Sequence, residues 1–481
     1  MYRAAARRIE RFVMNETELA YTPATELAAL IANKELSPVE VVRTLLERIE
    51  AHDGRINAFA HLAADAAMDA ARRAEAAVVT GERLGPLHGV PVTIKDLTIT
   101  RRMPTQFGSR IMEGNQPAED APVVTRLEEA GAIILGKTTS SEYGWTGVSR
   151  SPLTGLTHNP WKHGFNAGAS SAGAGAACAA GFGPLHQGSD GAGSIRMPSH
   201  FCGVFGLKPT YGLVPQYPVS TADYTTHVGP MTRTVADAAL MLRVMAGPHP
   251  LDHTSCGSLP SDYAVRLQDG IRGKRIAYSP DLGHARVDPE IAEIVRAAVP
   301  RFEALGAVVE EVALPWAKDG PELARLFWPA HFTRLAPKLP DWEERMDGGF
   351  VALIRAGLSI SMTDYMLARE RKAAYIAAAH RWFEDWDLLL TPAVSVAAFP
   401  AERLIPEHWP QHDWDWLSWA EFSYPFNLTG DPAASVPCGF TADGLPVGLQ
   451  IVGRRFDDLG VLQAAAAFED VQRWAEKRPP L

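Results

Sequence analysis

Residues 188–212 read GSDGAGSIRMPSHFCGVFGLKPTYG, and one serine, Ser194, stands there among four small residues: Gly188, Gly191, Ala192 and Gly193. Ordering glycine costs more backbone entropy than ordering any other residue, so this composition needs a physical reason. A plain turn is one. Another is a loop that points several backbone N–H groups at one oxygen, as the attack of a hydroxyl on a carbonyl requires.

Two other stretches carry groups that suit such an attack. GVPVTIKD (89–96) holds Lys95, and NAGASSAGAGAACAAG (166–181) holds Ser170 and Ser171. A serine hydroxyl is a weak nucleophile unless a neighbouring base takes its proton. Lysine can be that base only when neutral, so its pKa must fall from about 10.4 to near 7, which burial favours. Each stretch alone is more often a turn or a solvated lysine.

Other motifs do not fit these residues. GASSAGAG lacks the Lys-Ser/Thr pair of a phosphate loop. Neither serine stretch is Gly-x-Ser-x-Gly, because residues 168–172 read GASSA and residues 192–196 read AGSIR, which weakens the α/β-hydrolase alternative. Four widely spaced cysteines and fifteen histidines without ligand spacing predict no metal site.

The composition indicates a soluble globular protein. Of its 481 residues, 46% are hydrophobic and 21% are charged, and the net charge is −10. This charge argues against general binding to nucleic acid or to an anionic membrane surface. Residues 1–19 lack the apolar core of a signal peptide, and no stretch approaches the roughly 18–20 apolar residues of a membrane span. We therefore expect a cytoplasmic protein.

The elements that must position these groups alternate between helix and strand. The expected elements are helices over much of 1–85, a strand at 88–97 that ends near Lys95, a helix and strand at 122–138, a helix at 229–247, a βαβ-like unit at 273–315, and a strand at 445–453 followed by a helix. This order predicts an α/β fold, with one central mixed, mostly parallel sheet covered by helices on both faces.

One region is rich in tryptophan. Residues 382–419 hold six of the twelve tryptophans, namely Trp382, Trp386, Trp409, Trp414, Trp416 and Trp419. They could supply local core, which is the commoner outcome, or line a pocket for an apolar or aromatic ligand. Trp414, Trp416 and Trp419, together with Tyr143, are the candidate pocket residues.

Taken together, these stretches resemble the amidase signature family, serine amidohydrolases with a Ser–cis-Ser–Lys triad. The resemblance covers most of the chain and weakens over about 250–420. The matching stretches include LSPVEVVRTLLERIEAHDGRINAF, GPLHGVPVTIKDL, GAIILGKTTSSEY, the two serine stretches, GLKPTYG, PFNLTGDPAASVPCGF and GLPVGLQIVGR. The resemblance implies one amidase domain over 1–481, with a helical part (1–85), a signature core (86–250), a variable substrate side (250–420) and a return to the sheet (421–481).

The resemblance also implies the roles of the chemical groups. Ser194 is expected to be the nucleophile, Lys95 the base, and Ser170, 24 positions before Ser194, the bridging serine after a cis peptide bond. The N–H groups of Gly191, Ala192, Gly193 and Ser194 are expected to form the oxyanion hole, with Asp190 and Ser171 in support.

Two departures from the family pattern concern backbone conformation. Ala169 and Ala172 stand in the first serine stretch, and Ala192 in the second, where the family usually has glycine. If Ala192 required a positive φ, it would cost about 1 kcal/mol or more.

We therefore expect an amidohydrolase that cleaves a carboxamide-type bond through an acyl-serine, on an apolar or aryl amide, anilide or carbamate. It should need no cofactor and no metal, and its partner should be a small amide rather than nucleic acid or membrane; the family makes a homodimer plausible. The alternative is the family's glutamine-hydrolysing subunit of a tRNA-dependent amidotransferase. A non-catalytic binding protein with the same fold is a second alternative.

Overall fold

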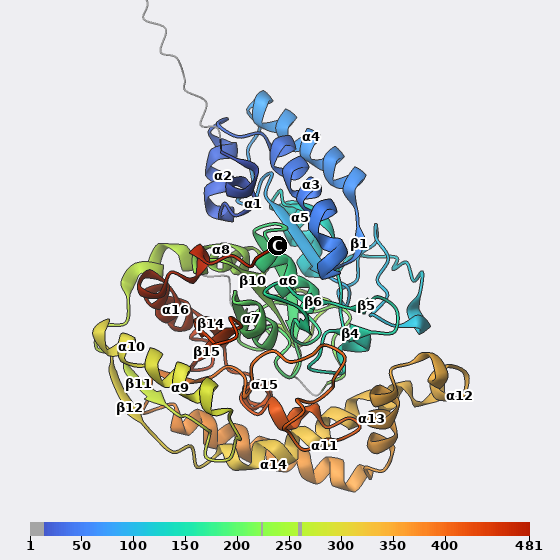
Figure 1. The fold of residues 1–481 in the computed structure, drawn as a ribbon, viewed down its shortest axis with the longest axis vertical. Coiled ribbons are helices and arrows are strands. Elements are labelled where there is room, and N and C mark those ends of the chain that lie inside the picture. The colour runs from blue at the N-terminus through green and yellow to red at the C-terminus, as the bar shows by residue number, and fades with distance from the viewer. Residues whose placement is uncertain (1–13, 223–224, 258–261) are drawn as a thin grey trace, which may run out of the picture.

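The computed structural model describes residues 14–222, 225–257 and 262–481 (Figure 1). Most of the stretch examined for a signal peptide, residues 1–13, lies outside the described residues. One 11-stranded sheet runs through the molecule. Its strands, in spatial order, are β1 (Phe59–Leu62), β3 (Ile133–Thr138), β2 (Pro91–Lys95), β8 (Leu185–Asp190), β10 (His227–Thr232), β9 (Phe205–Lys208), β14 (Ala433–Phe440), β15 (Pro446–Gly453), β13 (Leu388–Pro392), β11 (Arg275–Tyr278) and β12 (Val308–Glu311).

The sheet is mixed, as expected, but its parallel pairs are the minority. Within the described residues, β2 runs parallel to β3 and β8, and β11 runs parallel to β12 and β13. The other six neighbouring pairs are antiparallel. The cause is that β14 and β15 return as consecutive antiparallel strands, and that β10 runs opposite to both of its neighbours.

The strand expected at 88–97 is β2, and Lys95 is its last residue. The helix expected at 229–247 begins later, because its first residues complete β10 and pair with β8 (Gly229 lies opposite Gly188). The helical part is α8, Val235–Met245, whose N-cap Thr234 accepts a hydrogen bond from Asp237 N.

Helices cover both faces of the sheet, which confirms the expected layers. Successive side chains of a strand point to opposite faces. In β15, Leu449 and Ile451 belong to the core cluster that includes residues of α16 (Asp458–Gln472), whereas Gln450 accepts a hydrogen bond from Arg196 at the start of α7 (Arg196–Cys202). The other helices around the sheet are α5 (Pro122–Glu129), α6 (Ala172–Ala180), α9 (Pro289–Ala298), α10 (Pro300–Ala304) and α15 (Tyr424–Thr429).

Four helices at the amino-terminal end form one pole of the molecule, namely α1 (Glu16–Ala20), α2 (Ala24–Ala32), α3 (Pro38–Ile56) and α4 (Ala64–Thr80) (Figure 1). Ser37 caps α3, and its Oγ accepts from Val39 N and Glu40 N at 3.1 and 3.3 Å. The apolar spacing read from the sequence places Val41 and Leu45 on the buried face of this helix.

Helices of the opposite pole pack around a second, aromatic core (Figure 1). They are α11 (Gly320–Phe332), a 3₁₀ helix (Thr333–Lys338), α12 (Leu339–Trp342), α13 (Gly348–Leu358) and α14 (Met362–Trp382). No single helix of the described residues has the length and apolar composition to cross a membrane; α13 and α14, which meet at a 95° bend, reach them only as a pair.

Candidate active site

Lys95 lies at the centre of the candidate site. The strand β2 ends at this residue between β3 and β8, and its side chain is fully buried. Its Nζ is 2.7 Å from Ser170 Oγ, 2.8 Å from Ser171 Oγ and 3.0 Å from Ser189 Oγ. A fourth contact, at 3.1 Å, goes to the carbonyl oxygen of Ser189. The amine is therefore enclosed by three hydroxyls and one carbonyl.

The surroundings of Lys95 favour the neutral amine. Burial lowers the pKa of Lys95 well below its ordinary value, because a low-dielectric interior disfavours the ammonium. The charge of Asp190 acts in the opposite direction and raises this pKa. Within the described residues no carboxylate contacts Nζ. A buried lysine with hydroxyl partners is suited to accept a proton from one of them.

Ser170 connects Lys95 to Ser194. It lies in the turn between β7 (Lys162–Asn166) and α6, where its hydroxyl contacts Lys95 and its N–H donates to Ser194 Oγ at 3.3 Å. Within the described residues the Ser194 hydroxyl has no hydrogen bond to the Ser170 hydroxyl, so the two serines meet through the backbone. Lys95, Ser170 and Ser194, far apart in the sequence, are therefore brought together as expected.

The expected cis peptide bond before Ser170 is not present. Within the described residues the cis bond is Tyr217–Pro218.

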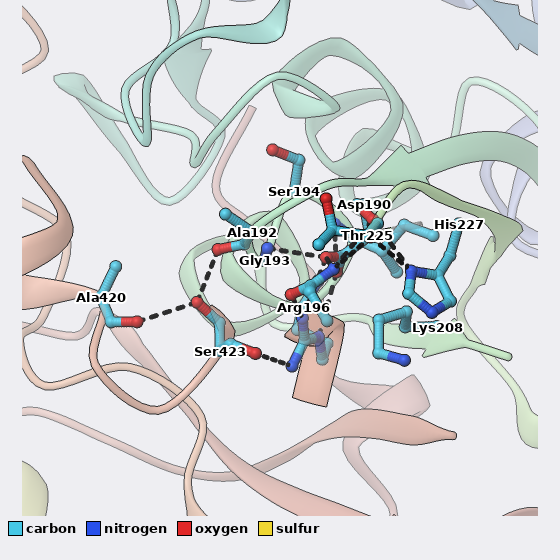
Figure 2. A network of polar contacts seen from close by, with 12 residues as sticks. Asp190, Ala192, Gly193, Ser194, Arg196, Lys208, Thr225, His227, Ala420 and Ser423 are labelled. Atoms are coloured by element: carbon cyan, nitrogen blue, oxygen red, sulfur yellow. Dashed lines mark hydrogen bonds and ion pairs between the residues drawn. The ribbon is translucent and has the colours of Figure 1, made fainter. Parts of the chain in front are cut away.

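The loop that carries Ser194 is folded around the carboxylate of Asp190 (Figure 2). Asp190 Oδ1 accepts from Gly193 N at 2.6 Å, and Oδ2 accepts from Ile195 N at 3.1 Å. The Arg196 guanidinium donates to the same carboxylate at 2.9 and 3.0 Å. Asp190 and Arg196 are both fully buried. The loop is therefore fixed by its own first and last side chains, as expected of Asp190.

Arg196 also ties this loop to the carboxyl-terminal part of the chain. Its guanidinium donates to Ser423 O at 2.8 Å, Gln450 Oε1 at 2.8 Å and Asn427 Oδ1 at 2.6 Å. Burial alone would raise the pKa of Asp190, but the charge and hydrogen bonds of Arg196 hold it below its usual range. The carboxylate thus remains ionised, and Arg196 is a salt-bridge partner and carbonyl anchor.

The expected oxyanion donors are not equivalent. The N–H of Gly193 is engaged by Asp190, whereas within the described residues the N–H groups of Gly191, Ala192 and Ser194 donate no hydrogen bond. The Ser194 side chain points away from the Asp190–Arg196 network (Figure 2). Three of the four expected donors therefore have no acceptor among the described residues, and the fourth, Gly193 N, is engaged by Asp190.

The alanines that replace family glycines are not strained. Ala169, Ala172 and Ala192 are absent from the residues with positive φ, whereas Gly168 and Gly193 have φ of 109° and 120°. A Cβ on Gly193 would lie 2.4 Å from Ser423 Oγ, and one on Gly168 would lie 2.3 Å from Pro198 Cα. Glycine is thus required at these two positions and not at the three alanines.

A cavity of about 370 Å³ opens beside these groups. Ser170 and Gly191 lie in its lining, and its walls carry the aromatic side chains Phe107, Tyr143, Trp328 and Phe332. Tyr143 is therefore at the cavity, as expected. It has an unusual φ of 48°, and its ring stacks on Phe107 at 5.5 Å. Bulky residues rarely adopt this backbone conformation, and functional sites are where such strain gathers.

The tryptophans of the carboxyl-terminal segment do not line this cavity. Trp416 and Trp419 are 1% and 0% exposed, and Trp414, half-buried, is also absent from the lining. Trp416 Nε1 donates to Trp145 O at 2.8 Å and stands behind Trp328, with ring centroids 5.8 Å apart. These three tryptophans were expected to line the pocket. Instead they belong to the aromatic core that supports the cavity wall.

Two of the aromatic residues that do line the cavity belong to α11. Trp328 and Phe332 are four residues apart, so they share one face of this helix. The Trp328 Nε1 donates to Trp145 O at 2.8 Å, which fixes the indole. The i, i+4 spacing of this aromatic pair is a sequence signal for the wall, weaker than the local tryptophan density of residues 382–419. Within the described residues no group of three or more His, Cys, Asp or Glu could hold a metal ion.

Most of the chain is similar to known amidases. A family model described as Amidase matches residues 40–462. An acylamidase of Rhodococcus erythropolis is 40% identical over 476 residues, which cover 97% of this chain and 98% of that protein. A glutamyl-tRNA(Gln) amidotransferase subunit from Moorella thermoacetica is 37% identical, with coverage of 96% and 99%. The solved structure of a bacterial aryl acylamidase of the amidase signature family has a TM-score of 0.88, 30% identity and coverage of 96% and 99%.

Proposed function

The chain belongs to the amidase signature family and is an amidohydrolase, and from this premise we propose that Ser194 is its nucleophile, Lys95 its base and Ser170 the group between them. One observation carries the proposal. A fully buried lysine contacts Ser170 Oγ at 2.7 Å, and the N–H of the same serine reaches Ser194 Oγ at 3.3 Å.

The proton path follows from these contacts. Ser194 Oγ attacks the carbonyl carbon while its proton passes to Ser170 Oγ, and the Ser170 proton passes to the neutral Lys95. This step requires rotation of the Ser194 side chain until the two hydroxyls meet. The Lys95 ammonium then returns a proton through Ser170 to the substrate nitrogen, the C–N bond breaks, and the amine leaves. Water attacks the acyl-serine by the same route and releases the acid.

The oxyanion forms beside the loop after Asp190. The N–H groups of Gly191, Ala192 and Ser194 supply the donors, and the Asp190–Arg196 pair keeps them in place before the reaction. Preorganised donors of this kind typically contribute about 10²–10³ each to the rate.

The substrate is an apolar or aryl amide, anilide or carbamate. Support comes from the aromatic walls of the cavity, where Tyr143, Trp328 and Phe332 present large apolar surfaces. The acylamidase relative and the aryl acylamidase structure agree with this class.

The second candidate is a glutamine-hydrolysing subunit, which the 37% identity to an amidotransferase subunit favours. Glutamine carries an α-ammonium group, and burying that charge calls for an acidic partner. None of the described residues that line the cavity is Asp or Glu. This composition favours the aryl or apolar amide.

The test is hydrolysis of 4-nitroacetanilide, benzamide, an aryl carbamate and glutamine by the purified chain, with fluorophosphonate labelling. The variants are Ser194→Ala and, as a control at an exposed serine, Ser359→Ala. We expect anilide turnover and labelling to vanish only in Ser194→Ala. Turnover or labelling that survives in Ser194→Ala would overturn the assignment of the nucleophile. Turnover of glutamine alone would establish the second candidate.

A further inference from the structure

The cavity beside Ser170 continues into a second one. This second cavity, of about 330 Å³, is lined by residues of α11, α13 and α14 and by the segment before residue 223. Four residues belong to the lining of both cavities, namely Thr221, Ala222, His331 and Arg334. The space open to a substrate is therefore longer than one aromatic ring, and these four residues mark its junction.

Arg334 is the charged residue of this junction. None of the described residues that line either cavity is Asp or Glu. The neighbouring His331 is neutral at physiological pH, because burial and the charge of Arg334 together lower its pKa to about 3. Asp364 of α14, near the second cavity in sequence, is engaged in a capping box with Ser361. The junction thus carries a positive charge that no lining carboxylate offsets.

In the part of the chain that the structure describes, the guanidinium of Arg334 has no carboxylate partner. Within the described residues its contact is a cation–π interaction with Tyr143, at 5.8 Å to the ring centroid. Arginines on the surrounding helices are paired. Arg325 of α11 contacts Asp415 at 2.7 Å, and Arg371 of α14 contacts Glu322 at 2.6 Å. Arg334 differs from these neighbours because it lines both cavities and, within the described residues, has no carboxylate partner for its N–H donors.

We propose that the substrate carries a carboxylate that pairs with Arg334 while its amide carbonyl lies at Ser194. An arginine fork matches a carboxylate in geometry as well as in charge. This inference rests on the proposed function and narrows it, from apolar or aryl amides to those that also bear an anion. The carboxylate belongs either to the acyl part or to the amine part of the amide.

Two substrate pairs test the inference and separate these two sources. On the amine side, 4-acetamidobenzoate is compared with its neutral isostere 4-nitroacetanilide. On the acyl side, succinic acid mono-4-nitroanilide is compared with 4-nitrobutyranilide. Arg334→Gln removes the charge and keeps a polar side chain, Arg334→Lys keeps the charge without the fork, and Arg345→Gln is the control at an exposed arginine outside both cavities.

The expected result is an effect on one carboxylate substrate only. In Arg334→Gln its KM should rise about tenfold or more with kcat nearly unchanged, Arg334→Lys should restore part of this loss, and the neutral isostere should change less than twofold. Benzoate, as an inhibitor of 4-nitroacetanilide hydrolysis, should weaken in parallel, whereas nitrobenzene should not. The substrate pair that responds identifies the part of the amide that bears the anion.

Other outcomes would overturn the inference. Equal losses on charged and neutral substrates would make Arg334 a structural residue, and unchanged KM and benzoate inhibition would leave it without a substrate role. These failures are distinct from failure of the proposed function, which the neutral anilide and Ser194→Ala report by themselves.

Discussion

Replacing Gly193 by alanine tests the loop that presents Ser194. The φ of Gly193 is 120°, and an added Cβ would lie 2.4 Å from Ser423 Oγ and 2.7 Å from Met197 Cε. Backbone strain of this kind costs about 1–3 kcal/mol, and overpacking a buried site costs about 1–3 kcal/mol more. Ser423 cannot simply turn away, since its Oγ is within hydrogen-bond distance of two carbonyl oxygens, Ala192 O at 2.7 Å and Ala420 O at 2.9 Å (Figure 2). The loop itself must therefore move.

Movement of this loop displaces the N–H groups of Ala192 and Ser194. Because losing one oxyanion donor typically costs about 10²–10³ in kcat, Gly193→Ala should lower kcat on 4-nitroacetanilide at least a hundredfold. The rate is measured per active site, and denaturant unfolding reports stability separately. The matched control is Gly183→Ala, at φ 136°, where the nearest atom, Leu135 Cδ1, is 3.7 Å away. This control should lose stability but keep kcat within about threefold.

The reasoning would be refuted by a Gly193→Ala enzyme with kcat within threefold of the wild type. An equal loss of kcat in Gly183→Ala would refute it too, because positive φ alone would then explain the effect.

Three further predictions concern other parts of the site. Burial lowers the pKa of Lys95, so kcat/KM should rise as the pH passes through this lowered pKa and then level off, which a pH–rate profile measures. The unfolded chain keeps the proton up to about pH 10.5, so the free energy of unfolding should rise with pH from the lowered pKa to about pH 10.5. Lys95→Met should abolish activity and reduce this pH dependence of stability in denaturant melts at two pH values. Arg196→Met should cost about 3–5 kcal/mol in denaturant melts, because it leaves the charge of Asp190 buried and unpaired. Trp416→Phe should lower the free energy of unfolding by about 1 kcal/mol, measured by the same method, because it removes one hydrogen-bond donor to Trp145 O. It should leave kcat unchanged, because Trp416 lies outside the cavity lining.

The chemical groups could be predicted from the sequence because their signals are local. Lys95 ends a short β-branched run, and such a run next to turn formers predicts a strand end. The spacing of Ser170 and Ser194 then matched a family pattern, and in the structure Ser170 Oγ contacts Lys95 while the Ser170 N–H contacts Ser194 Oγ. The engagement of Gly193 N by Asp190 was not predictable, because it depends on how the loop closes on its own carboxylate.

The central strands β8 and β10 could not be predicted from the sequence, because they carry little local signal of a strand. The strand β8 reads LHQGSD, with one β-branched or large apolar residue among six, and β10 contains Gly229 and Pro230. Neither has strand propensity of its own. Both are strands because their neighbours in the sheet pair with them, and strand propensity reflects such context more than the residues themselves. The residue after β8 begins the loop that carries Ser194, and the small residues of this loop give no strand signal in the sequence.

The aromatic wall of the cavity shows what tryptophan density in the sequence could predict and what it could not. Tryptophan density around Trp416 indicated an aromatic region but not its direction, because the indole N–H that fixes this ring finds its partner, Trp145 O, 271 positions away. The cavity wall instead comes from Trp328, Phe332 and the following Arg334, on a segment that contributes none of the groups in contact with Lys95 or Ser194. On the proposed function, bond cleavage and substrate choice therefore depend on separate parts of the chain. Substitutions in the segment 328–334 should therefore change KM and selectivity while the chemistry at Ser194 stays the same.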